Sequence, residues 1–203
     1  MILHSAPMPA PNPRRVRVVA AEKGIVLTEV MLDLRARDHK ATAHLARNSL
    51  GQVPVLELED GTMISETLAI CRYLDAIQPD PPLFGRVPVD IANIEMWIRR
   101  IEIQIGEPTK MFWRHAHPAT AALIEQHTIF GESNRAIVAR SICWLEDEMA
   151  DNRPFVAGQF YSMADIVLLT LLDFAIFVGL DSPAEGSHLF SWHQRISKRA
   201  STE

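Results

Sequence analysis

The hydrophobic pattern of the first eighty or so residues alternates between short apolar runs and amphipathic segments. It predicts strands over residues 1–4 and 25–34, a hairpin over 53–64, and helices over 14–23, 38–47 and 65–77. Two turn signals support these assignments. Gly24 follows the first helix, where glycine tolerates a left-handed backbone, and Asp60-Gly61 lies at the centre of the hairpin. The order βαβ, then α, then ββα predicts a small α/β domain.

The pattern changes after the segment "QPDPPLFGRVP" (78–88), which contains four prolines and a glycine. No strand pattern follows it, and apolar residues instead recur at helical spacing, as at Ile94, Ile98, Ile101 and Ile105. We predict long helices over 89–116 and 119–150, and a very apolar helix that Ser162 caps with Asp165 as its capping-box partner. The chain is therefore expected to form an α/β domain (1–79), a linker (80–87) and an all-α domain (88–203).

Composition and charge limit the classes of partner. The 203 residues carry a net charge of -5 with scattered Lys and Arg, which argues against a nucleic-acid or anionic-membrane surface. No apolar run is long enough to span a bilayer, and no signal peptide is evident. Cys71 and Cys143 lie far apart in apolar helical surroundings, which predicts two reduced thiols. We expect a cytoplasmic protein with a small-molecule partner.

Three segments in combination resemble the cytosolic glutathione transferase superfamily over nearly the whole chain. They are "GQVPVLELEDGTMISET" (51–67), the proline-rich linker, and "AGQFYSMADI" (157–166). The flanking sequences are most similar to the bacterial theta-like and nu-like members. The resemblance implies a thioredoxin-like N-terminal domain that binds glutathione as co-substrate, an α-helical C-terminal domain, and a homodimer. It also implies that a hydrophobic electrophile pocket includes residues of the first long helix, at Met111, Phe112 and Trp113.

The resemblance assigns glutathione-binding roles to six residues: His39, Gln52, Val53, Pro54, Ser65 and Glu66. Val53-Pro54 matches a cis Val-Pro pair whose valine backbone pairs with the cysteine of glutathione like an added strand. Ser65 and Glu66 match the pair that binds the γ-glutamyl end, and His39 and Gln52 match positions that bind the glycine end. Simpler interpretations remain open, namely a proline at a strand start, Ser65 as a helix N-cap, and His39 on the solvated surface.

The loop "APMPAPNPRRV" (6–16) lies where this superfamily activates the glutathione thiol, yet it contains no hydroxyl. Ala10 occupies the position of the hydroxyl in serine-type members. Asn12 matches an asparagine that nu-like members direct at the sulfur, and it is our candidate catalytic residue. Asn12 followed by Pro13 is also a preferred N-cap and N1 pair, so a structural role is the alternative. Ser5 and backbone N–H groups are the other candidate donors.

The sequence leaves more than one function open. The leading hypothesis is conjugation of the glutathione thiolate to a hydrophobic electrophile. Glutathione-dependent peroxidase, disulfide reductase or dehalogenase chemistry is an alternative, as is a non-catalytic binding or dimerisation protein. No metal is expected, because His115 and His117 are two residues apart on a helix end and do not share a face.

Overall fold

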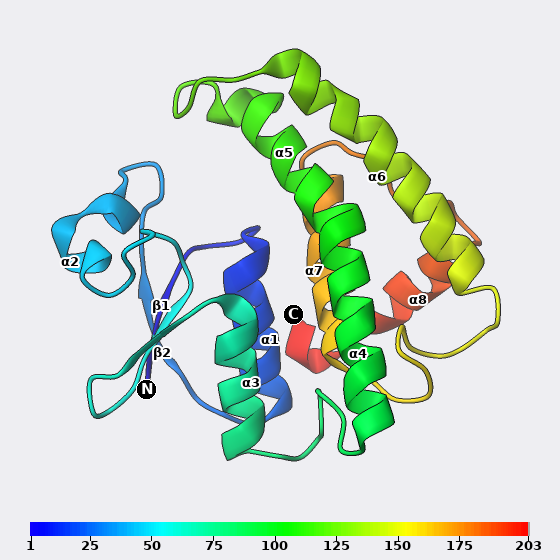
Figure 1. Ribbon diagram of the computed structural model, residues 1–203, viewed down its shortest axis with the longest axis horizontal. Helices are drawn as coiled ribbons and strands as arrows, with labels where there is room; N and C mark the ends of the chain where they lie inside the picture. The colour runs from blue at the N-terminus through cyan, green and yellow to red at the C-terminus, as the bar shows by residue number, and fades with distance from the viewer. Residues whose placement is uncertain (203) are drawn as a thin grey trace. The chain divides into compact units, whose positions relative to one another are not determined.

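The computed structural model describes residues 1–202 and divides the chain into two compact units between Leu83 and Phe84 (Figure 1). This boundary lies inside the segment that composition marks as a linker. The first unit is an α/β domain and the second contains only helices among its described residues. The predicted fold class, a thioredoxin-like domain followed by an all-α domain, is confirmed.

The first unit is built on a four-stranded mixed sheet in the order β2-β1-β3-β4. Its strands are β1 (Ile2–Ser5), β2 (Thr28–Met31), β3 (Val55–Glu57) and β4 (Met63–Ser65). Its helices are α1 (Pro11–Glu22), α2 (Thr42–Leu45) and α3 (Thr67–Ile77), with a 3-10 turn η1 (Asp38–Lys40). β1 pairs with β2 in parallel and with β3 antiparallel, and β3 pairs antiparallel with β4. The last pairing confirms the predicted hairpin.

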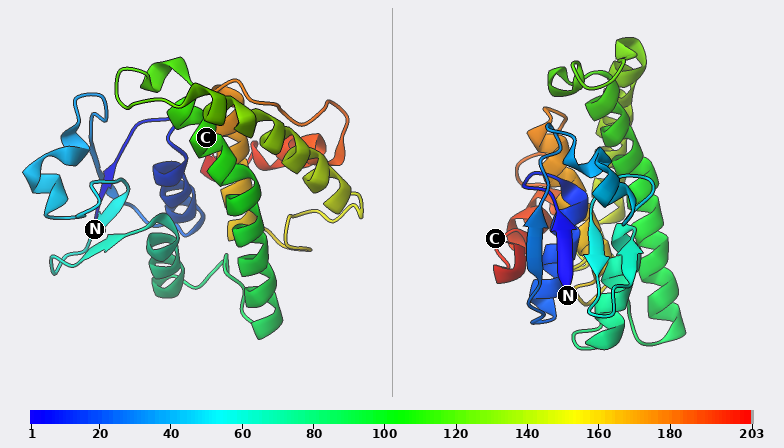
Figure 2. Two further views of the ribbon diagram at one scale, coloured as in Figure 1. Left: turned by 45° about the horizontal axis from the view of Figure 1, so that its top comes forward. Right: turned by 90° about the vertical axis from the view of Figure 1, so that its left-hand side faces the viewer.

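Helices α1 and α3 pack against each other and cover one face of this sheet, while α2 lies on the other side (Figures 1 and 2). The core between them consists of aliphatic side chains with no exposed surface, namely Leu3, Val16, Val19, Val55, Leu56, Ile70 and Leu74. β2 is shorter than predicted and all four of its residues are exposed. As an edge strand it pairs only with β1, which is itself four residues long, so the apolar run 25–34 forms a short strand.

Two helix starts differ from the sequence-based prediction. α1 begins at Pro11 instead of residue 14, because a proline needs no N–H partner in the first turn of a helix. α3 begins at Thr67, since Ser65 remains paired with Val55 in the hairpin. The alternative that Ser65 caps this helix is therefore wrong, and the N-cap position belongs to Glu66.

A buried lysine ties the C-terminal end of α1 to α3. The Nζ of Lys23, whose side chain has no exposed surface, lies 2.5 Å from Oδ1 of Asp75 and donates to the carbonyl of Pro81. The same Oδ1 accepts a hydrogen bond from the Leu83 N–H at 3.1 Å. Through these contacts the segment that leaves the first unit is fixed to both helices.

The second unit has a core of helices that differ in length from those predicted. They are α4 (Pro88–Ile101), a π-helical turn η2 (Glu102–Gly106), α5 (Glu107–His115), a 3-10 turn η3 (Pro118–Thr120), α6 (Thr128–Glu148), α7 (Met163–Phe177), α8 (His188–Ile196) and a 3-10 turn η4 (Ala200–Thr202). α5 packs along α6, and α4 packs on α7 (Figure 1). Within residues 1–202, none of these helices combines the length and apolar character that a membrane crossing requires.

The predicted helix 119–150 is wrong at its start. The Thr120 hydroxyl donates to the Trp113 carbonyl at 2.7 Å, and the Gln126 side chain donates to the His117 carbonyl at 2.9 Å. These bonds satisfy carbonyls at and just beyond the C-terminal end of α5, and they fix a loop before α6. By contrast, the predicted helix 89–116 is nearly continuous through α4, the π-helical turn and α5. The wider turn precedes Pro108, which has no N–H to contribute to the helix.

The start of α7 confirms the predicted capping box between Ser162 and Asp165. Asp165 is fully buried and its carboxylate accepts four hydrogen bonds. The donors are the Val156 N–H, the Ser162 N–H and hydroxyl, and the indole N–H of Trp192. One carboxylate thus joins the start of α7, the preceding loop and α8.

Candidate functional site

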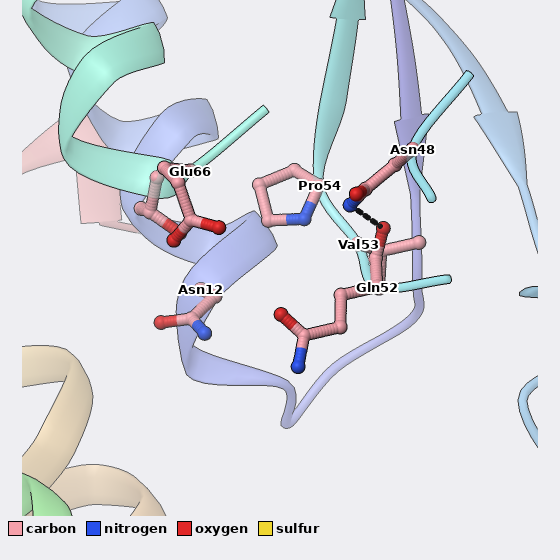
Figure 3. Close-up of a pocket in the computed structure, with 7 residues that line it drawn as sticks. Asn12, Asn48, Gln52, Val53, Pro54 and Glu66 are labelled. Atoms are coloured by element: carbon pink, nitrogen blue, oxygen red, sulfur yellow. Dashed lines mark hydrogen bonds between the residues drawn. The ribbon is translucent and has the colours of Figure 1, made fainter. Parts of the chain in front are cut away.

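A small polar pocket opens to solvent within the first unit (Figure 3). Its lining residues come from the N-terminal ends of α1 and α3 and from the loop before β3, and they are Asn12, Asn48, Gln52, Val53, Pro54, Glu66 and Thr67. The side chains of Asn12, Gln52 and Glu66 point toward the same space. Two helix N-termini and a non-helical backbone segment therefore meet at one small volume.

Asn12 is the second residue of α1, and its side chain is exposed in the pocket. Ala10 occupies the N-cap position, so the interpretation of Asn12 as the helix cap is wrong. The reason is that Pro11 already takes helical geometry and starts the helix one residue before Asn12. Within residues 1–202 the Asn12 amide makes no hydrogen bond, so both of its N–H donors are available to a ligand.

Glu66 adopts an unusual backbone conformation, with φ 69° and ψ 120°. This region is costly for a residue other than glycine, at about 1–3 kcal/mol, and such strain concentrates at ligand sites. The conformation turns the chain from β4 into α3 and leaves the Glu66 carboxylate exposed in the pocket (Figure 3). The first N–H groups of α3 have no partner inside the helix, which favours a bound anion.

The backbone of Val53 offers free hydrogen-bonding groups within the segment 52–54. The Val53-Pro54 peptide is cis, as the resemblance implies. β4 ends at Ser65 opposite Val55, so Val53 lies beyond the end of β4 on that side of β3. Among residues 1–202 neither the N–H nor the C=O of Val53 is hydrogen-bonded, which leaves a position where an extended peptide can pair.

The pocket brings together five predicted residues, Asn12, Gln52, Val53, Pro54 and Glu66, but His39 and Ser65 are not part of its lining. Ser65 ends β4, and His39 lies in η1. Burial, together with the charge of Lys40, holds the pKa of His39 below its usual value. The neutral imidazole has one N–H to donate, and its Nδ1 is buried without a partner in the described chain.

Two lining residues, Asn48 and Thr67, were not predicted. Asn48 belongs to the segment "NSLG", in which its side chain accepts from the Leu50 N–H at 3.1 Å and its carbonyl accepts from the Gly51 N–H at 2.7 Å. The sequence signals a turn here, but not one that faces a pocket. Thr67 lies at the start of α3, and nothing in the sequence distinguishes it from other residues of a first turn.

The alternative hydroxyl, Ser5, is in a different environment. Ser5 lies in β1 with no exposed surface, and its Oγ accepts a hydrogen bond from Arg17 at 2.8 Å. It is not among the residues that line the pocket. Of these two candidates, only Asn12 lines the pocket and presents its donors there.

The predicted electrophile residues lie on α5 in the second unit, in different environments. Phe112 is buried, and the Arg135 guanidinium lies over its ring at 4.6 Å. Met111 and Trp113 are half-buried, and the Trp113 ring packs against Phe174. Met111 and Trp113 thus keep surface that a ligand can contact, and Phe112 contributes mainly to the core.

The comparisons with known proteins agree over both units. Residues 10–77 match the family described as "Glutathione S-transferase, N-terminal domain", and residues 109–200 match "Glutathione S-transferase, C-terminal domain". Glutathione S-transferase 2 of Saccharomyces cerevisiae is 36% identical over 100% of this chain and 88% of its own length. The chain belongs to the glutathione transferase superfamily.

Two other relatives show how this superfamily varies. A crystal structure of a glutathione S-transferase domain-containing protein from Marinobacter aquaeolei VT8 superimposes with a TM-score of 0.91 and 31% identity, covering 100% of both chains. Elongation factor 1-gamma 1 of Oryza sativa subsp. japonica is 30% identical over 74% of this chain but only 35% of its own length. A segment similar to most of this chain therefore also occurs within a longer protein.

Proposed function

We propose that this protein binds glutathione in the pocket of Figure 3 and conjugates its thiolate to a hydrophobic electrophile. One observation carries the proposal: free amide donors of Asn12, the open backbone of Val53 and the exposed carboxylate of Glu66 face one volume. These groups complement, respectively, a thiolate, the backbone of a cysteine and an ammonium group. Glutathione carries all three on one tripeptide.

The γ-glutamyl end binds at the start of α3 in this proposal. Its carboxylate accepts hydrogen bonds from the first N–H groups of the helix, where the helix dipole also favours negative charge. Its ammonium group pairs with the Glu66 carboxylate. Ser65, the residue before Glu66, supports this end from the last position of β4.

The cysteine and glycine of glutathione extend along the loop before β3. The cysteine N–H and C=O pair with Val53, next to Pro54, as an added strand segment. The Gln52 amide binds the glycine end, and His39 and its neighbour Lys40 supply N–H donors and positive charge on the adjacent turn η1. Together these contacts orient the thiol toward α1.

Asn12 and the N-terminus of α1 then stabilise the thiolate. Pro11 and Pro13 have no N–H, so the donors at this helix end are the Asn12 side chain and the Asn12 backbone N–H. A thiol of pKa near 8.5 becomes a thiolate at neutral pH when such donors and the helix dipole lower its pKa. The thiolate attacks an electrophilic carbon, a C–S bond forms, and the leaving group departs with the bonding electron pair.

The electrophile is hydrophobic in this proposal, because Met111 and Trp113 present apolar and aromatic surface and Phe112 supports them from the core. Peroxide, disulfide and dehalogenation chemistry use the same glutathione thiolate. Turnover of glutathione against aryl halide, epoxide, peroxide and disulfide substrates distinguishes these reactions.

A non-catalytic role is the second candidate. It is favoured by the similarity to a rice elongation factor 1-gamma and by Ala10, which replaces a hydroxyl at the loop. A protein of this kind binds glutathione or a partner without turnover. Glutathione binding without turnover of any substrate in the panel would favour this role over catalysis.

Glu66→Gln is expected to weaken glutathione binding about tenfold, since it removes the charge that pairs with the γ-glutamyl ammonium at an exposed position. Glu59→Gln provides the matched control, because Glu59 is an exposed carboxylate of the same domain outside the pocket. Titration calorimetry of the three proteins with glutathione measures the effect. Equal dissociation constants for both variants would show that glutathione does not use this pocket as proposed.

We also propose that the protein is a cytoplasmic homodimer, with exposed apolar side chains at and near α4 as part of the subunit interface. These are Val87, Val89, Ile91 and Met96, of which Val89 is 71% exposed. A subunit interface would remove these apolar side chains from water. Light scattering is expected to give twice the 22.8 kDa of one chain, and a mass of 22.8 kDa at working concentration would contradict the homodimer.

A further inference from the structure

A carbonyl oxygen in the glutathione pocket accepts hydrogen bonds from two buried side chains. The Gln52 carbonyl accepts from Nε2 of His44 and from Nδ2 of Asn48, both at 3.0 Å (Figure 3 shows the second bond). His44 is 2% exposed and Asn48 is 7% exposed. His44 lies in α2, and Asn48 follows that helix and also lines the pocket.

These two bonds do not complete a secondary-structure element. Gln52 lies outside every helix and strand, so neither bond forms part of a helix or sheet ladder. A carbonyl oxygen can only accept, so Nε2 of His44 carries the proton in this contact. The other ring nitrogen, Nδ1, is buried without a partner among residues 1–202. The two hydrogen bonds offset the cost of burying the His44 Nε2–H and the Asn48 amide N–H, whereas the burial of Nδ1 remains uncompensated.

The rest of the turn restricts the same segment. Gly51 has φ 57°, and a Cβ at this position would lie 2.7 Å from the His39 carbonyl oxygen and 2.9 Å from the Leu45 side chain. The Asn48 side chain also accepts from the Leu50 N–H at 3.1 Å. The chain between Asn48 and Gln52 is thus held from both of its ends.

We propose that His44 and Asn48 are positioning residues for glutathione: by holding the Gln52 carbonyl they set the direction of the Gln52 side chain and of the Val53 N–H. The inference rests on the proposed function of this pocket. Gln52 and Val53 present their ligand-facing groups from a loop, which would otherwise sample several conformations. A fixed loop binds more tightly because the observed dissociation constant equals the intrinsic one divided by the fraction of protein in the competent conformation.

Asn48→Asp tests the inference with little change in shape. It replaces the donor with an oxygen that repels the Gln52 carbonyl and retains the acceptor for Leu50. We expect the glutathione dissociation constant from calorimetry to rise about tenfold. A rise of this size corresponds to about a tenth of the protein molecules keeping the loop in its binding-competent conformation. In steady-state kinetics KM for glutathione should rise similarly, while KM for the electrophile should not change.

Asn134→Asp is the matched control. Asn134 is 5% exposed and its Nδ2 donates to the Phe130 carbonyl at 2.7 Å, so the substitution makes the same chemical change in the second unit. It should lower stability, measured by urea unfolding, and leave glutathione affinity unchanged. A similar loss of affinity in both variants would mean that general destabilisation is the cause and would overturn the inference.

His44 supplies an independent comparison. His44→Gln places an amide N–H near the original Nε2, whereas His44→Leu provides no donor. We expect His44→Gln to recover most of the affinity that His44→Leu loses. Equal affinity of these two variants would overturn the inference, and this comparison decides it if Asn48→Asp does not fold.

A double-mutant cycle tests whether Asn48 changes glutathione affinity through the Gln52 side chain. If Asn48 acts through the Gln52 side chain, Asn48→Asp should cost less affinity in a Gln52→Ala background than in the wild type. Additive losses would contradict that route. A wild-type protein that binds no glutathione contradicts the proposed function itself, whereas a wild type that binds and variants that bind equally contradict only the positioning role.

Discussion

Asn12→Asp is expected to lower glutathione turnover at pH 7 by roughly ten- to a hundredfold. The substitution removes the N–H donors and adds a negative charge beside the thiolate. At about 4 Å, two like charges repel by roughly 1 kcal/mol in water and about 4 kcal/mol at an effective dielectric constant of 20, which corresponds to a rise in thiol pKa of about 1 to 3 units. Ultraviolet titration of bound glutathione measures that rise, and the pH profile of turnover should move with it.

The folded stability of this variant should match or slightly exceed that of the wild type. Asn12 is the second residue of α1 and not its cap, so no capping bond is lost, and a carboxylate near a helix N-terminus is favourable. Asn12→Ala removes the N–H donors without adding a charge, so it should raise the thiol pKa less than Asn12→Asp does. If neither variant moves the thiol titration, Asn12 does not stabilise the sulfur, and backbone N–H groups carry any activation.

Asp165→Ala is expected to destabilise the second unit by about 3–5 kcal/mol, among the larger losses for a single substitution. The change leaves the N–H groups of Val156, Ser162 and Trp192 without their acceptor in a fully buried site. Ser162→Ala is the milder comparison, because it removes only the hydroxyl of the capping box and should cost about 0.5–2 kcal/mol. Urea unfolding at pH 7 measures both, and a loss below about 1 kcal/mol for Asp165→Ala would contradict this account.

The contribution of Asp165 to the free energy of unfolding should also depend on pH. Burial raises the pKa of Asp165 to about 6 from an ordinary 3.8, although the four hydrogen bonds act in the opposite direction. The folded protein therefore retains a proton that the unfolded chain releases between these values. The contribution of Asp165 to the free energy of unfolding should fall as the pH rises from about 4 to about 6. Asp165→Asn does not titrate in this interval, so its free energy of unfolding should lack the Asp165 contribution to the pH dependence. A constant difference in free energy of unfolding between the wild type and this variant from about pH 4 to about pH 6 would contradict the prediction.

The sequence predicted well those elements whose signals are local. The hairpin at Asp60-Gly61 and the capping box of Ser162 and Asp165 each depend on residues a few positions apart, and both were confirmed. Helix starts were less predictable. Ser65 and Asn12 both have cap-forming side chains, yet sheet pairing holds Ser65 in β4, and Pro11 starts α1 before Asn12.

The sequence by itself determined the α/β order of the first unit, the helical second unit and the resemblance to glutathione transferases. These features depend on hydrophobic periodicity and short motifs, which involve residues close together in the sequence. Only the tertiary structure decided which residues share the pocket. Asn48 and Thr67 join the lining, and His39 and Ser65 lie outside it. Ser5 is buried and hydrogen-bonded to Arg17. The physical reason is that a pocket forms where elements distant in sequence pack together, so its membership depends on the strand register and on the exact start of two helices.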